Sequence, residues 1–177
     1  MVNKPDWIQE VFPSSKGLEI IDGYNEDSNA LAIVTSSVMQ TFAFARWTQL
    51  SQSELVKAGE KTLQIINNLS SDQKINLIVD ISNVHYGEME NAVKDLVQLI
   101  NTIPTLKAIL QHQQIVWYVL IRGNNKLNFV VSIAFNIALK AVRPKDSLRY
   151  FSVESADQLV NDPRLLSPEN FNYPEEP

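Results

Sequence analysis

Apolar residues recur along this chain with two different spacings, and each spacing predicts a different element. Residues 18–22 and 30–35 are short apolar runs separated by turn-forming residues 23–29, which predicts a β-hairpin. Residues 41–47 predict a third strand. The nearly continuous apolar runs at 75–81 and 115–121 are typical of strands buried on both faces, and residues 148–153 predict a last strand.

Helical spacing lies between these runs. Ser51 and Glu54 form a capping-box pattern that predicts a helix to about residue 69. Further helices are predicted over residues 89–100 and 127–142, and a short one after Ser155. Strands that alternate with helices predict an α/β domain, with a mixed sheet of about five to six strands covered by helices. We assign this domain to residues 18–160, with an N-terminal arm at 1–17 and an irregular tail rich in proline and glutamate at 161–177.

Composition and charge narrow the functional classes. The 177 residues include no cysteine, which excludes disulfides, thiolate metal sites and cysteine nucleophiles. The start of the chain does not resemble a secretory signal, and no apolar run reaches the roughly 20 residues of a membrane span, so we expect a cytoplasmic protein. The net charge of −5, without a lysine- or arginine-rich run, disfavours nucleic-acid binding.

The segment 127–142 has an unusually wide apolar arc. Its polar residues form one narrow stripe, and the remaining arc is wider than one contact with a sheet requires. One interpretation is a deeply buried core helix. The others place Phe129, Ile133 and Ile137 at a homodimer surface, or at the wall of a cavity for a lipid or a small apolar ligand.

A cluster of reactive side chains follows the strand at 75–81, in the sequence VDISNVHYGEMENA. His85, Glu88 and Glu90 are candidates for metal binding or acid–base catalysis, but a metal site needs three or four converging ligands. The simpler interpretation is that Glu88 and Glu90 stabilise the start of a helix through its dipole. Asp80, at the end of the strand, is expected to accept backbone amides of the following loop. We therefore expect no catalytic residues, no metal and no cofactor.

The stretch LIVDISNVHYGEMENAVKDL resembles a motif of the STAS-like superfamily, which is named for sulphate transporters and anti-sigma factor antagonists. Asp80, Ser82 and Val84 occupy the motif's apolar-D-apolar-S-x-V positions, and LRYFSVESADQLV resembles the terminal strand and helix of the antagonist-like members. The resemblance covers residues 18–160. It implies a STAS-like layered fold and a regulatory domain that binds another protein.

The family's Asp-Ser-Ser-Gly sequence is absent, because Glu88, Met89, Glu90 and Asn91 stand at its four positions. The serine that antagonist-like members phosphorylate is therefore missing, and a phosphorylation switch is not expected here. Our leading hypothesis is a non-enzymatic interaction domain that docks a protein partner through the 83–91 loop. The residues predicted to bind that partner are His85, Tyr86, Glu88, Met89, Glu90 and Asn91. The alternatives are a carrier of lipid or small apolar molecules and, third, a hydrolase or metal-dependent enzyme.

Overall fold

The structure is a computed structural model that describes residues 19–27, 29–35, 41–48, 52–84, 104–124 and 149–160, together with positions 133, 136, 137 and 140. Within these residues the chain forms an α/β domain with a six-stranded mixed sheet and three helices. The predicted arm at 1–17, the tail at 161–177 and the helix predicted over 89–100 lie outside the described residues.

The strands closely follow the apolar runs of the sequence. They are β1 (Glu19–Asn25), β2 (Asn29–Thr35), β3 (Phe42–Trp47), β4 (Ile75–Asp80), β5 (Ile115–Ile121) and β6 (Arg149–Val153). The helices are α2 (Gln52–Asn68), α4 (Pro104–Leu110) and α6 (Ala156–Val160). The predicted mixed sheet of five to six strands is thereby confirmed.

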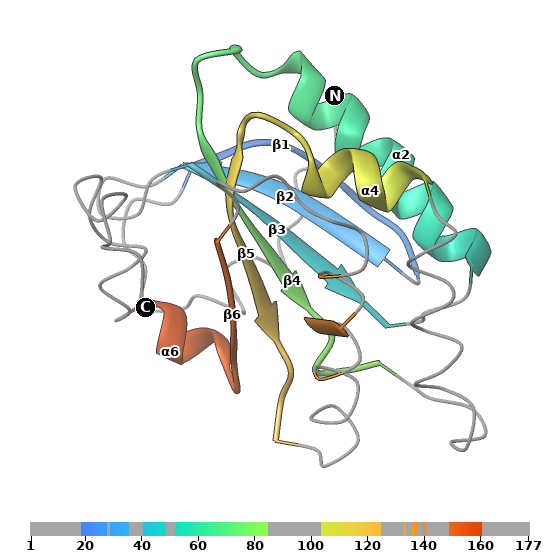
Figure 1. The fold of residues 1–177 in the computed structure, drawn as a ribbon, viewed down its shortest axis with the longest axis vertical. Coiled ribbons are helices and arrows are strands. Elements are labelled where there is room, and N and C mark those ends of the chain that lie inside the picture. Colours follow the sequence, from blue (N-terminus) through green and yellow to red (C-terminus); the bar gives the residue numbers. More distant parts are fainter. Residues whose placement is uncertain are drawn as a thin grey trace.

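The strands lie in the sheet in the order of the sequence, from β1 to β6 (Figure 1). β1, β2 and β3 pair antiparallel, whereas β3, β4, β5 and β6 pair parallel. The four parallel strands therefore end at the same edge of the sheet. There Arg46, Asp80, Ile121 and Val153 lie side by side in register.

The two faces of the sheet carry separate apolar clusters. Under α2 and α4, the residues Leu55 and Ile66 of α2 and Leu106 of α4 pack on the odd-numbered residues of β4. The opposite cluster contains Phe44, Val119 and, from α6, Leu159. Because side chains alternate across a strand, Arg46 and Asp80 belong to this second face. β4 and β5 are thus buried on both faces, as the apolar runs at 75–81 and 115–121 predicted, whereas the edge strand β1 is partly exposed.

The predicted hairpin forms, but its turn was placed too early. Residues 23–25 belong to β1 rather than to the turn, and Gly23 pairs with Ala32. A β-carbon on Gly23 would lie 2.4 Å from the backbone oxygen of Leu31, so glycine is needed for the close approach of two strands. The pairing also shifts register next to Ile21, which is 47% exposed, as at a β-bulge.

The helix α4 was not predicted from the sequence. It begins at Pro104, a residue suited to the first position of a helix because it lacks an amide hydrogen that would remain unbonded there. Its Thr105 packs closely against Gly59 of α2, where an added β-carbon would lie 3.3 Å from the Thr105 β-carbon. The two helices lie side by side in Figure 1.

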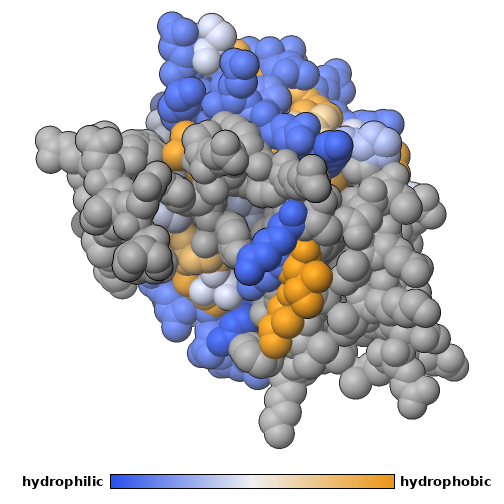
Figure 2. All heavy atoms as spheres, viewed as in Figure 1, coloured by the Kyte–Doolittle hydropathy of each residue, from blue (hydrophilic) through white to orange (hydrophobic). Residues whose placement is uncertain are grey.

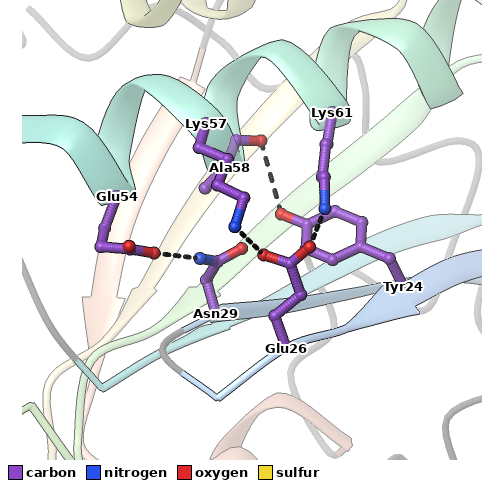
Figure 3. A network of polar contacts seen from close by, with 7 residues as sticks. All are labelled: Tyr24, Glu26, Asn29, Glu54, Lys57, Ala58 and Lys61. Carbon is purple, nitrogen blue, oxygen red and sulfur yellow. Dashed lines mark hydrogen bonds and ion pairs between the residues drawn. The ribbon is translucent and has the colours of Figure 1, made fainter.

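A group of polar residues links the hairpin to α2 (Figure 3). Glu26 binds Lys57 at 2.8 Å and also Lys61, whose ammonium lies 4.8 Å from the centre of the Tyr24 ring. The Asn29 amide donates to Glu54 at 2.9 Å. Hydrogen bonds from Lys57 and Lys61 lower the pKa of Glu26. We call these six residues the hairpin cluster.

Candidate functional site

An open crevice lies at the edge where the parallel strands end. Its volume is about 430 Å³, which falls within the range of roughly 300–1,000 Å³ typical of ligand sites. In α/β proteins, binding residues are often carried by the loops that follow the carboxyl ends of parallel strands. The lining residues are Arg46, Asp80, Ser82, Asn83, Ile121, Gly123, Asn124, Glu154, Ser155, Ala156 and Asp157. We call this the carboxyl-edge crevice.

Asp80 is the buried acid of the crevice, with only 5% of the residue exposed. Its Oδ1 accepts the backbone amide of Ser82 at 2.9 Å, as predicted for an acid at the end of a strand. Its Oδ2 lies 3.9 Å from Nε of Arg46 on the neighbouring strand. Both oxygens of this carboxylate therefore face groups of the chain itself.

The second charged pair joins β5 to the start of α6. The Arg122 guanidinium donates to Glu154 Oε1 at 2.6 Å, and its own side chain is only 19% exposed, against 46% for Glu154. The backbone amide of Arg122 also donates to the carbonyl of Val153. The Gln158 side chain accepts the amide of Glu154 at 2.9 Å, which fixes the start of α6 relative to β6.

Glycine at position 123 turns the chain away from the sheet after β5. Its φ of 69° lies in the left-handed region that favours glycine. Asn124, which is exposed, follows this turn and lines the crevice together with Asn83 and residues of α6. The rim therefore carries hydrogen-bonding side chains from three separate segments of the chain.

The charges of the crevice are uneven. Arg46 is the cation among the lining residues, and it faces Asp80. The acids Glu154 and Asp157 stand together on the α6 side, and both are exposed. In the part of the chain that the structure describes, no three residues among His, Asp and Glu converge as metal ligands would. The described crevice thus offers hydrogen bonds and negative charge.

The six predicted partner-binding residues, His85, Tyr86, Glu88, Met89, Glu90 and Asn91, lie outside the described residues. The described chain reaches Val84, so it includes the start of the predicted 83–91 loop. Asn83 is exposed on the crevice, and the amide of Val84 donates to the carbonyl of Ile81 in a tight turn. The predicted loop therefore departs from the carboxyl-edge crevice.

Two of the three residues predicted for a homodimer or apolar-ligand surface are described, and both are exposed. Ile133 is 45% and Ile137 is 55% exposed, whereas Phe129 lies outside the described residues. Asn136 and Lys140 are helical and reach the surface beside them. In Figure 2 an apolar strip lies next to a polar one where the short helical pieces of this segment stand in Figure 1. At positions 133 and 137 the core interpretation is wrong; dimer formation stays a prediction.

A second, enclosed cavity lies between α2, α4 and the sheet. It is lined almost wholly by apolar groups, among them Trp47, Leu106 and Ile109, and its volume is about 20 Å³. That is room for about one water molecule. Tyr118 is among its lining residues, and burial raises the pKa of this phenol well above its ordinary value. This cavity, as it stands, is too small for a lipid.

Several residues of the crevice were missed from the sequence. Arg46, Glu154 and Asp157 are charged lining residues, and Arg122 is paired with Glu154 beside them. The sequence singled out none of these four as a site residue. Only their positions in the sequence could have indicated them. Each lies at or just beyond the end of an apolar run that forms a parallel strand, or at the start of the following helix. Their proximity depends on strand order, which an apolar pattern does not specify.

Comparisons with known proteins returned no relative: no protein-family profile, no curated protein and no solved structure matches this chain. Among the described helices, none has both the length and the apolar character that crossing a membrane requires.

Proposed function

We propose that this protein is a non-enzymatic regulatory domain of STAS-like type, which docks a protein partner at the carboxyl edge of its parallel strands. The docking surface would consist of the 83–91 loop together with the rim from which it departs. The observation that carries this proposal is the arrangement around Asp80, whose carboxylate is engaged by Ser82 and Arg46 next to an open, polar rim.

The same arrangement disfavours catalysis by the described residues. A general base must reach a proton on the substrate or a nucleophile. Asp80 instead faces a backbone amide and a guanidinium, and it is 5% exposed. The exposed groups Asn83 and Asn124 do not titrate, and they suit hydrogen bonding to a partner. In a docking surface, such side chains can form hydrogen bonds to the partner without any change of protonation.

The order of elements is compatible with the STAS-like resemblance. The acid of the motif ends β4, and the sequence LRYFSVESADQLV forms the strand β6 and the helix α6. Both serines of the family's motif are absent, and Glu90 places a permanent negative charge near the switch position. The proposed docking is therefore constitutive, because a glutamate holds its charge without a kinase.

The carrier function receives less support. A site for a lipid or a drug-sized molecule takes roughly 300–1,000 Å³, whereas the enclosed apolar cavity between α2 and α4 measures about 20 Å³. The wall predicted from segment 127–142 has two of its residues, Ile133 and Ile137, on the surface. We therefore favour protein docking over apolar carriage.

The test is partner recovery with matched charge reversals. The double variant Glu88→Lys with Glu90→Lys is compared with a control double variant, Glu60→Lys with Asp72→Lys. The control changes the net charge by the same amount, at exposed sites on α2 and in the turn that follows it. Crosslinked partners from the cells that make the protein are identified by mass spectrometry. We expect recovery to fall about tenfold in the loop variant alone. Equal recovery from both variants contradicts the docking function, provided that both melt like the unmodified protein.

A further inference from the structure

The strand β1 forms one edge of the sheet, and among the described residues its outer side pairs with no other strand. An edge of this kind presents backbone amides and carbonyls with which a strand of another chain can pair, and native proteins commonly protect it. Which backbone groups of β1 point outward follows from its pairing with β2.

Two residues of β1 direct their amides away from β2. The amide of Glu26 donates to the carbonyl of Asn29 at 2.9 Å, so these residues form a hydrogen-bonded pair at the turn of the hairpin. Hydrogen-bonded and non-hydrogen-bonded pairs alternate along two antiparallel strands. Counted back from the turn, Asn25 and Gly23 belong to pairs of the second type, and their amides therefore point outward.

The outward amide of Gly23 is bonded by a side chain of its own strand. It donates to Oδ1 of Asp22 at 2.7 Å. Gly23 is buried, whereas Asn25 is exposed. A strand added to this edge would have to take the Gly23 amide from the carboxylate and offer a neutral carbonyl in exchange, although hydrogen bonds to charged acceptors are the stronger ones. The oxygen of that carbonyl would also approach a negative charge.

Two further features of β1 oppose the addition of a strand. The pairing with β2 shifts register between Ile20 and Asp22, and a bulge bends the edge and increases its twist. Glu19 is exposed at the start of β1, and the strand contains no lysine or arginine. Two copies of β1 lying against each other would therefore bring acids close to acids, and like charges opposed across strands are destabilising.

We propose that Asp22 closes the free edge of β1 to strand addition, and so prevents this sheet from pairing with the sheet of a second copy of the chain. The inference concerns assembly and goes beyond the proposed docking function, since none of the described residues that line the carboxyl-edge crevice belongs to β1. With the Asp22 carboxylate removed, the amides of Gly23 and Asn25 would both face outward as a template for a second β1.

The first measurement needs no substitution. Amide hydrogen exchange is followed by NMR on the full chain labelled with ¹⁵N, and the two outward amides are compared. Gly23 should exchange about tenfold more slowly than Asn25, because its amide is bonded to the carboxylate of Asp22. Equal exchange of the two amides would overturn the proposal.

Self-association tests the consequence. Asp22→Ala is compared with Asp27→Ala, which removes the same charge in the hairpin turn, where the backbone carbonyl of Asp27 accepts the bond from Thr48. Sedimentation velocity over a range of concentrations should show dimers that are about tenfold tighter for Asp22→Ala than for the unmodified protein, because each copy contributes one freed amide. Asp27→Ala should behave as the unmodified protein does.

A further variant shows where the association takes place. Ile21 is 47% exposed beside the bulge, and a lysine at this position would carry its charge into an approaching strand. Asp22→Ala combined with Ile21→Lys should associate no more than the unmodified protein. Equal association of Asp22→Ala and Asp27→Ala, or association that Ile21→Lys does not reverse, would overturn the proposal. Melting curves show that each variant is folded, and if Asp22→Ala is not, the exchange measurement decides.

Discussion

The hairpin cluster and the carboxyl-edge crevice both contain acidic, basic and amide side chains, but in the cluster these join two elements of the fold and in the crevice some stay exposed. In the hairpin cluster, Glu26 lies between two lysines of α2, and Asn29 bonds to Glu54 of the same helix. Every one of these contacts joins the hairpin to α2. In the crevice, Glu154 and Asn83 remain exposed after their own elements are fixed.

The difference between the two lies in where the elements end. The hairpin cluster lies between the β1–β2 hairpin and α2, and its polar groups bond to one another across that contact. The crevice lies beyond the ends of four strands, where the chain diverges and side chains project into solvent. The ion-paired acids of the two regions show this difference: the Glu26 side chain is 27% exposed between its two lysines, whereas Glu154 is 46% exposed beside Arg122.

The largest effect is expected in the strand that carries the hairpin cluster. Gly23→Ala places a β-carbon 2.4 Å from the Leu31 oxygen, so β1 must move away from β2. We expect the free energy of unfolding to fall by about 3 kcal/mol, near the top of the range for overpacked sites. Urea denaturation followed by circular dichroism measures it. Gly59→Ala is the control, because a gain of about 1 kcal/mol in helix propensity offsets its milder contact with Thr105. Equal losses in both would contradict the argument.

The next effect concerns the buried acid of the crevice. Asp80→Ala removes the acceptor of the Ser82 amide and leaves Arg46 facing an apolar group. The expected loss is about 2 kcal/mol, the usual size for a hydrogen bond to a charged group. Asp80→Asn keeps an acceptor oxygen and should recover part of it, as urea midpoints will show. If both variants are as stable as the unmodified protein, Asp80 is not the structural centre of the crevice.

A smaller effect, with a pH signature, is expected at Glu26. Its pKa lies below the ordinary value of 4.5 because Lys57 and Lys61 donate to it, so its stabilising contribution is present above that value and is lost as pH falls through the lowered pKa. Glu26→Gln should cost about 0.5–1 kcal/mol at pH 7, since these side chains are partly exposed and screened. The difference in melting temperature from the unmodified protein should shrink towards pH 3. A difference that stays constant with pH would rule out the ion pairs as its cause.

The smallest effect is expected at the exposed rim. Glu154→Gln keeps an acceptor for Arg122 and changes a side chain that is 46% exposed. We expect less than about 0.5 kcal/mol in stability, as for most surface positions, measured by the same denaturation. A loss as large as that of Asp80→Ala would place Glu154 with the structural residues and remove the contrast between cluster and crevice.

Much of the fold was predictable because apolar runs report burial directly. The runs at 75–81 and 115–121 became β4 and β5, buried as expected. The turn after Asp22 was misread because Gly23 is typical of a turn and also of a close strand contact, and a single sequence does not distinguish the two. The helix α4 was missed because its seven residues span less than two full turns.

The candidate site was predictable only in its location. Asp80 lies at the end of a buried run, so its bond to a loop amide followed from the sequence. Its contact with Arg46 did not, because the two residues meet through the parallel pairing of β3 with β4. The predicted partner residues at 85–91 remain a prediction, and so does a homodimer through Phe129, Ile133 and Ile137.

The order of the strands has a consequence for how the chain is made. Each strand pairs with the one synthesised immediately before it, from β1 to β6. A chain leaving the ribosome can therefore extend its sheet one strand at a time. No later strand of this sheet has to be inserted between two strands that have already paired. Nascent chains stalled after β3, β4 and β5 should resist protease progressively, and protection that appears only after β6 would show that the sheet instead forms all at once.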